Sequence, residues 1–169
     1  RVSTAPGKAV SRKTSSPLCT AAKARVVGTP RACIASDTTY SRKTGPSQAR
    51  PSPMQTVELN LAGRGCRIHI GPGLLQQAAL WRPLMGSGKT LVVTNSRVGP
   101  LYLDGLLQTL QEWHPESMEL PDGEEHKTLE NWSRILARLA SIGAGRDSML
   151  VALGGGVVGD LCGFAAAAY

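Results

Sequence analysis

The sequence lacks the long apolar runs and the paired cysteines that characterise membrane-spanning and zinc-binding proteins. No stretch approaches the roughly 18 consecutive apolar residues of a membrane helix, so we expect no segment to span a membrane. The cysteines are scattered, with no C-x-x-C pair and no histidine at zinc-finger spacing, and are interpreted as reduced thiols. They are Cys19, Cys33, Cys66 and Cys162. From this composition we expect a soluble protein.

Acidic residues are almost absent from the first 53 positions, which hold ten lysines and arginines and the single acid Asp37. The net charge of this segment is +9, whereas residues 54–169 carry nine basic and eleven acidic side chains, a net charge of −2. The part expected to fold therefore has no basic excess to attract a polyanion. We expect no nucleic-acid partner, because the basic segment also has almost no aromatic side chains for base stacking.

Residues 1–53 hold fifteen serines and threonines and six prolines, and their apolar residues follow neither a helix nor a strand period. Such a segment buries too little surface to offset its ordering entropy, so we expect it to be disordered. A composition rich in Ser and Arg and poor in acids is also typical of an organelle transit peptide. A disordered tail, or translated upstream sequence before a start at Met54, would explain the same composition, and these alternatives stay open.

Residues 54–169 alternate strand-like and helix-like patterns and form the second expected domain. "TVELNL" and "CRIHI" alternate apolar and polar residues around a Gly-containing turn, which predicts a β-hairpin. Further strands are expected at residues 91–94, 117–120 and 148–153, and helices at 71–81, 98–113, 129–142 and from 161 onward. Strands that alternate with helices predict an α/β fold with a parallel sheet.

The last predicted helix has no closing signal, since no Gly, Pro or basic residue follows its Ala-rich run. We therefore expect Tyr169 to lie inside a helix and to be a fragment boundary.

The stretch "GSGKT", Gly86–Thr90, is spelled like the phosphate loop of nucleoside triphosphatases. That loop requires a glycine five positions before Gly88, where this chain has Pro83. It also follows a strand and opens a helix, whereas this stretch precedes a predicted strand. We therefore interpret it as a connector, with Lys89 as a surface loop lysine.

A second glycine cluster lies between a predicted strand and a predicted helix, at Gly154, Gly156 and Gly159. The G-x-G-x-x-G spacing leaves backbone amides and a helix N-terminus open to a pyrophosphate. Tight packing of the strand against the helix explains the same glycines. The acidic residue that completes the dinucleotide pattern would fall beyond Tyr169, so the pattern stays incomplete.

The segment "PDGEEHKTLE" places acidic residues and Lys127 at the start of a predicted helix. A carboxylate there could accept hydrogen bonds from ribose hydroxyls, and the lysine could meet a phosphate. Acids at a helix start are ordinarily capping and dipole partners, and the pattern alone favours that interpretation.

Four stretches, "VELNLAGRGCRIHIGPGLL", "LVVTNSRVGPLYLDGLL", "LPDGEEHKTLENW" and "LVALGGGVVGDLCGFAAAAY", together resemble the N-terminal half of the 3-dehydroquinate synthase family, within the sugar-phosphate cyclases. The likeness covers about residues 54–169. It implies a Rossmann-like NAD-binding α/β domain of which this sequence contains only the first part. In the family a helical metal-binding domain follows, and the resemblance implies that it lies beyond Tyr169. Plant-type members carry a cysteine at the position of Cys162 and a plastid transit segment, which implies a plastid location; the alternative is the cytoplasm.

The resemblance also implies a set of cofactor-binding residues. Glu124 and Lys127 would reach the adenosine end of NAD, and Asn95 would meet the adenine ribose. Gly155, Gly156, Val157 and Asp160 would line the pyrophosphate and nicotinamide side. The whole set is Asn95, Asp122, Gly123, Glu124, Glu125, His126, Lys127, Gly155, Gly156, Val157, Val158, Gly159 and Asp160.

The family reaction converts 3-deoxy-D-arabino-heptulosonate 7-phosphate to 3-dehydroquinate and phosphate in the shikimate pathway, with NAD and a divalent metal, zinc or cobalt. In the family the metal ligands and the substrate-binding lysines and arginines lie downstream of the position of Tyr169, so no metal or catalytic residue is assigned here. The resemblance implies a homodimer at full length and an inactive chain of 169 residues. The alternatives are another sugar-phosphate cyclase and a non-catalytic NAD-binding remnant.

Overall fold

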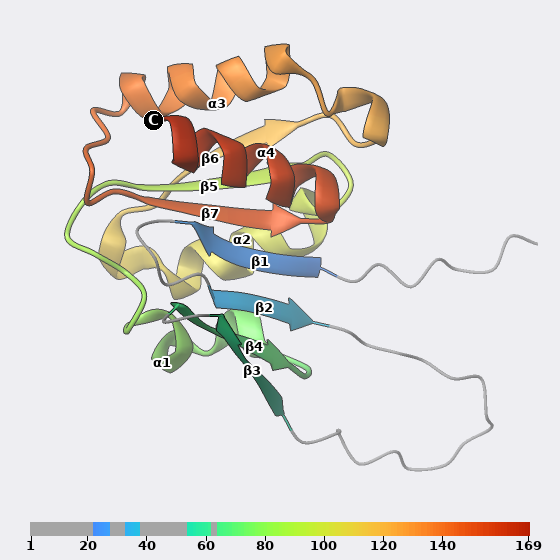
Figure 1. Ribbon diagram of the computed structural model, residues 1–169, viewed down its shortest axis with the longest axis vertical. Coiled ribbons are helices and arrows are strands. Elements are labelled where there is room, and N and C mark those ends of the chain that lie inside the picture. The colour runs from blue at the N-terminus through green and yellow to red at the C-terminus, as the bar shows by residue number, and fades with distance from the viewer. Residues whose placement is uncertain (1–21, 28–32, 38–53, 62–63) are drawn as a thin grey trace, which may run out of the picture.

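The computed structural model describes residues 22–27, 33–37, 54–61 and 64–169, which form a seven-stranded sheet with helices on both faces (Figure 1). The strands are β1 (Ala22–Val27), β2 (Cys33–Asp37), β3 (Gln55–Leu61), β4 (Arg64–Ile70), β5 (Thr90–Asn95), β6 (Glu116–Leu120) and β7 (Met149–Gly154). The helices are α1 (Ala78–Trp81), α2 (Gly99–Thr109), α3 (Leu129–Ser141) and α4 (Gly156–Ala168). Short 3-10 segments are η1 (Leu74–Gln76), η2 (Gln111–Trp113) and η3 (Glu124–His126).

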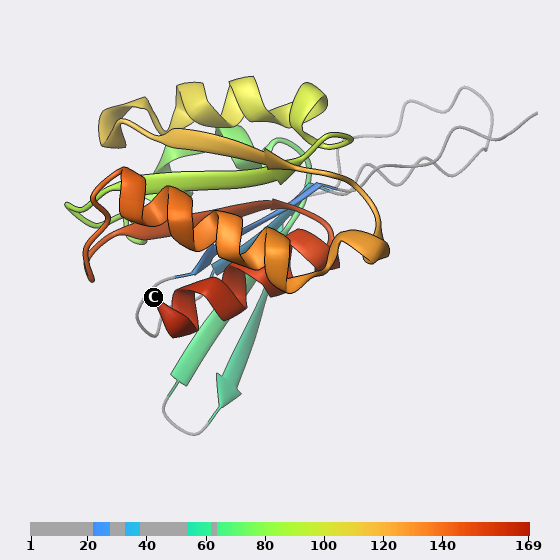
Figure 2. The same ribbon diagram turned by 90° about the horizontal axis from the view of Figure 1, so that it is seen from above.

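The strand order is β3-β4-β2-β1-β7-β5-β6, and β7, β5 and β6 run parallel. The chain passes from β5 outward to β6 and then back across β5 to β7. Because crossovers between parallel strands are right-handed, this reversal places α2 on one face of the sheet and α3 on the other. Figure 2 shows α2 above the sheet and α3 and α4 below it. The predicted α/β fold is confirmed in this parallel part.

Two hydrophobic cores lie on the two faces of the parallel strands. Along β5, Leu91 and Val93 pack towards α3 and α4, whereas Val92 packs towards α2. All six residues of β5 are buried, which explains why its apolar residues, Leu91–Val93, are consecutive rather than alternating. Ile135 from α3 and Leu106 from α2 fill the two cores and are both 0% exposed.

The expected helix over residues 71–81 is instead the 3-10 segment η1 and the single turn α1. Leu74, Leu75 and Trp81 are buried, and the Trp81 indole N–H donates to the Leu75 carbonyl oxygen at 3.1 Å. Burying each of these side chains contributes roughly 1.5–3 kcal/mol. That exceeds the roughly 1 kcal/mol of each helical hydrogen bond that the break loses.

The expected helix over residues 98–113 also divides, into α2 and η2. The Thr109 hydroxyl donates to the Gly105 carbonyl oxygen at 2.8 Å, a local bond that competes with helix continuation and bends helices. His114 then takes a left-handed conformation with φ 44° and ends the segment.

The last helix, α4, differs from the expectation at both of its ends. It begins at Gly156, earlier than the expected residue 161, because the chain turns into the helix directly after β7, with Gly155 as N-cap. The expectation that Tyr169 lies inside a helix is corrected, since α4 ends at Ala168 and Tyr169 is its C-cap. The Tyr169 N–H still donates to the Ala165 carbonyl oxygen at 2.9 Å, so the last turn is closed by a helical hydrogen bond.

The hairpin predicted around residues 62–63 is confirmed: β3 and β4 pair antiparallel, with Gln55 opposite Ile70 and Leu59 opposite Cys66. Its turn lies outside the described residues.

The strands β1 and β2 correct the expectation that residues 1–53 have no regular structure; the rest of that segment lies outside the described residues. β1 pairs antiparallel with β7, and β2 pairs parallel with β4. Without β1, the edge of β7 away from β5 would present unpaired backbone N–H and C=O groups, which can pair with a strand of almost any sequence. Because this pairing uses the backbone, the side-chain period of residues 22–37 could not reveal it.

No helix in the described ranges has both the length and the apolar character needed to cross a membrane.

Candidate functional site

The carboxyl ends of β5, β6 and β7 meet at one edge of the sheet, on the right in Figure 1. β5 ends at Asn95, β6 at Leu120 and β7 at Gly154. The helices that follow β5 and β7 depart to opposite faces of the sheet, at the point where the strand order reverses. In open α/β sheets this is the place where ligands bind. All of the predicted cofactor-binding residues lie at or just after these strand ends.

Asn95 is buried at this edge with its side-chain amide fixed at both ends. Its Oδ1 accepts a hydrogen bond from the Val98 N–H at 2.9 Å, and its Nδ2 donates to Asp122 Oδ1 at 2.6 Å. It is only 6% exposed. The Ser96 N–H also donates to the Leu120 carbonyl oxygen at 3.0 Å. The structure thus joins two segments that the sequence assigned to the site separately.

Arg97 is a residue of this edge that the sequence patterns did not identify. Its Nη1 lies 3.8 Å from Asp122 Oδ2. A lone arginine two positions after a strand carries no local signal. Only the order of the strands shows that the loop after β5 lies beside the loop after β6.

The loop from β6 to α3 is held by local geometry. Gly123 has φ 126°, and the Glu125 carboxylate lies where a Cβ at Gly123 would stand. Residues with a side chain rarely adopt this φ, so glycine is required here. At the end of the loop, Thr128 caps α3: its Oγ1 accepts from the Asn131 N–H at 3.3 Å. The Asn131 Nδ2 donates back to the His126 carbonyl oxygen at 2.8 Å.

The capping pair Thr128 and Asn131 was also missed, although a Thr directly before an apolar-periodic helix is its sequence signal. Thr128, rather than the acids at positions 124 and 125, therefore supplies the side-chain cap of α3. Of the two, Glu125 lies 3.9 Å from His126 Nε2 in an exposed pair.

Lys127 connects this loop to α4. Its Nζ lies 2.8 Å from Asp160 Oδ2 and 3.4 Å from Glu124 Oε1. The hydrogen bond and charge of Asp160 raise the pKa of Lys127 above its ordinary value of 10.5, with a smaller contribution from Glu124. Two predicted cofactor segments therefore meet through one lysine.

The glycines between β7 and α4 differ in their surroundings. A Cβ on Gly154 would lie 2.8 Å from the Val158 Cγ2, so this glycine permits tight packing of the strand against the helix. A Cβ on Gly155, Gly156 or Gly159 would meet nothing within 4 Å. These three leave an open surface that side chains would fill.

The N-terminus of α4 at this surface has no side-chain cap, since Gly155 occupies the N-cap position. Uncapped amide N–H groups and the helix dipole favour an anion there, and the missing side chains give it access. The residues present thus fit the pyrophosphate of a dinucleotide. Val158 is the exception in the predicted set: its side chain is buried in the core, which leaves only its backbone for a ligand.

Tyr169, beyond which the catalytic residues are expected, lies at the far end of α4 from this surface. Its hydroxyl donates to the Ala144 carbonyl oxygen at 3.0 Å, in the loop before β7, and the side chain is 51% exposed. The contact ties the end of α4 to the loop before β7, at the amino edge of the parallel strands. That the catalytic residues follow Tyr169 stays a prediction.

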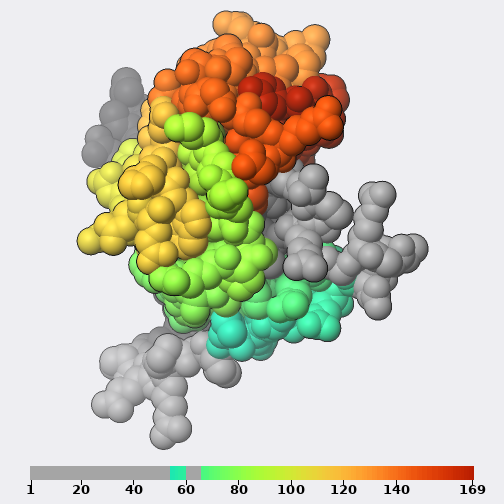
Figure 3. Space-filling model, turned by 90° about the vertical axis from the view of Figure 1, so that its left-hand side faces the viewer, coloured from blue at the N-terminus to red at the C-terminus, as the bar shows by residue number. Residues whose placement is uncertain are grey.

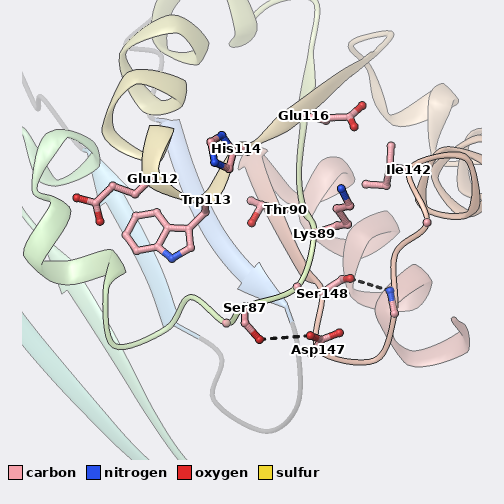
Figure 4. A pocket seen from close by; sticks show the side chains of 14 residues that line it. Ser87, Lys89, Thr90, Glu112, Trp113, His114, Glu116, Ile142, Asp147 and Ser148 are labelled. Carbon is pink, nitrogen blue, oxygen red and sulfur yellow. Dashed lines mark hydrogen bonds between the residues drawn. The ribbon is translucent and has the colours of Figure 1, made fainter.

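The stretch Gly86–Thr90 lies at this opposite, amino edge. There it lines a cavity of about 600 Å³, whose other lining residues are Glu112, Trp113, His114, Glu116, Ile142, Gly143, Gly145, Asp147 and Ser148. Figure 3 faces this edge, and Figure 4 shows Lys89 and Asp147 within the cavity. A Cβ on Gly86 would lie 2.9 Å from the Asp147 carbonyl oxygen, and one on Gly88 only 2.6 Å.

The glycines of this stretch are therefore needed for backbone contact with the loop before β7. The stretch precedes a strand, Thr90–Asn95, and opens no helix. The prediction that it is a connector rather than a phosphate loop is confirmed.

Across the described ranges, no group of three or more His, Cys, Asp or Glu side chains is arranged to hold a metal ion.

Sequence comparison places the chain beside characterised relatives. The family model described as 3-dehydroquinate synthase N-terminal matches residues 117–169. The chain is 48% identical over 118 residues to the 3-dehydroquinate synthase of Acidithiobacillus ferrooxidans and 47% identical over 116 residues to that of Methylococcus capsulatus. The enzyme of Coxiella burnetii is 44% identical over 115 residues. These matches cover 68–69% of the chain but 32% of each relative, so the chain spans about a third of their length.

Two crystal structures of 2-deoxy-scyllo-inosose synthase share the fold. One superimposes with a TM-score of 0.61 over 68% of the chain and 32% of the other protein, at 24% identity. The second gives a TM-score of 0.58 over 66% of the chain. The resemblance predicted from the sequence motifs is therefore confirmed, and this part of the chain matches the N-terminal region of the 3-dehydroquinate synthase family.

Proposed function

We propose that this chain is the nucleotide-binding part of an enzyme with 3-dehydroquinate synthase activity. The enzyme would convert 3-deoxy-D-arabino-heptulosonate 7-phosphate to 3-dehydroquinate and phosphate, as a carbon–oxygen lyase. The proposal is supported by the 44–48% identity to relatives with this name. The observation that carries it is the open glycine surface at the start of α4, which lies within the stretch matched by the family model.

The nucleotide that we propose for this edge is NAD. A structural neighbour, 2-deoxy-scyllo-inosose synthase, was determined with carbaglucose-6-phosphate, NAD+ and Co2+. The backbone of residues 155–157 would hold the pyrophosphate at the N-terminus of α4. Asn95, Asp122 and Glu124 would hold the adenosine ribose, and Lys127 would add a positive charge. When bound, NAD would supply reversible redox chemistry at a secondary alcohol, while the chain's own residues bind and orient it.

The remaining parts of the proposal concern the whole enzyme. A divalent metal, zinc or cobalt, would be held by residues outside those described here, and the enzyme would be a homodimer. Residues 54–169 would form the cofactor-binding domain and residues 1–53 a plastid transit segment, with a cytoplasmic enzyme as the alternative. The acid-poor, Ser- and Arg-rich composition of residues 1–53 supports the transit segment. A fusion of residues 1–53 to a fluorescent reporter in plant cells tests it: plastid fluorescence is expected, and diffuse cytoplasmic fluorescence would refute it.

The activity is tested on a protein extended to the length of the relatives, supplied with NAD+ and Zn2+ or Co2+. Phosphate release from the heptulosonate phosphate is expected, and replacing Gly156 by valine should abolish it. Phosphate release from glucose 6-phosphate instead would identify another cyclase. The chain of 169 residues by itself should bind NAD+ weakly and release no phosphate. Turnover by that chain would show that the rest of the relatives' length is not needed for the reaction.

A further inference from the structure

Asp122 divides its two carboxylate oxygens between two different partners at the carboxyl edge of the sheet. Oδ1 accepts from the buried amide of Asn95 at 2.6 Å, and Oδ2 lies 3.8 Å from the Arg97 guanidinium. The Asp122 side chain is 39% exposed and that of Arg97 is 52% exposed, so both reach solvent where a ligand would approach. Arg97 is thus a cation at the proposed nucleotide site whose charge is neutralised by a neighbouring carboxylate.

We propose that Asp122 determines which nucleotide this site accepts: it admits a ribose with a free 2′-hydroxyl and excludes a 2′-phosphate, because it pairs with Arg97. This inference rests on the proposed function. A carboxylate accepts a hydrogen bond from a hydroxyl, whereas a phosphate group has only acceptor oxygens to offer and carries the same sign of charge. In dinucleotide folds generally, an acidic residue selects the 2′-hydroxyl and a nearby arginine admits the 2′-phosphate. Both residues are present here, and the Asp122 carboxylate pairs with the Arg97 guanidinium.

The surroundings reinforce this selectivity. Asn95 cannot rotate to compensate, because the Val98 N–H fixes its oxygen and Asp122 fixes its nitrogen. The second cation of the edge, Lys127, already contacts Asp160 and Glu124. Three carboxylates, those of Asp122, Glu124 and Asp160, thus pair with the two cations Arg97 and Lys127.

The test compares the binding of NAD+ and NADP+ to the protein extended to the length of the relatives, by isothermal titration calorimetry. 5′-AMP and adenosine 2′,5′-bisphosphate serve as minimal probes of the same difference. The variant Asp122→Asn keeps an acceptor for Asn95 but removes the charge that neutralises Arg97. A matched control is Glu112→Gln, which removes a carboxylate paired with Arg82 at 2.6 Å at the other edge of the sheet. Thermal melts establish that each variant is folded.

The unmodified protein should bind NAD+ more tightly than NADP+. Asp122→Asn should shift the ratio of the two dissociation constants towards NADP+ by on the order of tenfold to a hundredfold, the effect of one nearby charge. Adding Arg97→Ala to this variant should abolish the gain for NADP+, and Glu112→Gln should leave the ratio unchanged. These results together would establish the inference.

The outcomes that contradict it are distinct from failure of the proposed function. If the folded Asp122→Asn variant still binds NAD+ and the ratio is unchanged, the inference is wrong while the proposed function stands. The same holds if the gain for NADP+ survives the loss of Arg97. If the unmodified protein binds neither nucleotide, the proposed function fails and the inference fails with it.

Discussion

Replacing Gly88 by alanine tests why the glycines of "GSGKT" are there. The added Cβ would lie 2.6 Å from the Asp147 carbonyl carbon, whereas two carbon atoms pack best at roughly 3.5–4.0 Å. One of the two backbone segments must therefore move by roughly 1 Å. Neither is free to do so, because the Met149 N–H donates to the Lys89 carbonyl oxygen at 2.7 Å and joins them. Overpacking of this kind costs about 1–3 kcal/mol.

The cost is measured by denaturant unfolding, and by a fall in Tm of roughly 4 °C for each kcal/mol. Affinity for NAD+ should not change, because Gly88 lies at the opposite edge from the glycine surface. The matched variant is Gly156→Val, because a Cβ added at Gly156 would lie within 4 Å of no other protein atom. It should abolish NAD+ binding and leave the free energy of unfolding within about 1 kcal/mol of the parent. Loss of NAD+ binding in Gly88→Ala at unchanged stability would overturn this assignment of the two glycine clusters.

Further predictions concern single side chains. Lys89→Ala should leave NAD+ affinity unchanged by calorimetry, and a loss as severe as that of Gly156→Val would contradict the connector interpretation. Thr128→Ala should lower the free energy of unfolding by about 0.5–2 kcal/mol through loss of the α3 cap, while Thr128→Ser should retain most of it; equal losses would exclude the cap as the cause. The pKa of Lys127 is raised above 10.5 in the folded protein, so the stability from its ion pairs is complete below pH 10.5 and is lost as the pH rises through the folded pKa. In Asp160→Asn this pKa should fall towards its ordinary value in an NMR titration, and an unchanged value would show that Asp160 is not its main cause.

The sequence predicted the parallel strands and the main helices because their side chains carry the information. The apolar residues of β5 and β7 are consecutive, at 91–93 and 149–153, since both faces of these strands are buried, and α3 repeats apolar residues towards one core. The 3-10 segments were missed because the burial of Trp81 and the back-bond of Thr109 override the helical period. β1 and β2 were missed because backbone pairing leaves no side-chain pattern.

The glycine clusters show both the reach and the limit of spacing arguments. Counting to Pro83 was enough to exclude a phosphate loop, since that motif is defined locally. Whether Gly154 packs or binds could not be decided from spacing, because the answer depends on the Val158 side chain one turn along α4. Arg97 was missed for a related reason. It forms an ion pair with Asp122, and only the strand order brings these two residues together.

The contact between Lys127 and Asp160 makes two stretches of chain energetically interdependent although 33 positions separate them in sequence. A substitution at Asp160 alters what Lys127 offers to a ligand, and a ligand that withdraws Lys127 leaves Asp160 without its partner. Effects of changes at the two positions on affinity should therefore fail to add, by an amount that a double-mutant cycle reports. Any attempt to retune one of these segments for a new nucleotide has to redesign the other at the same time.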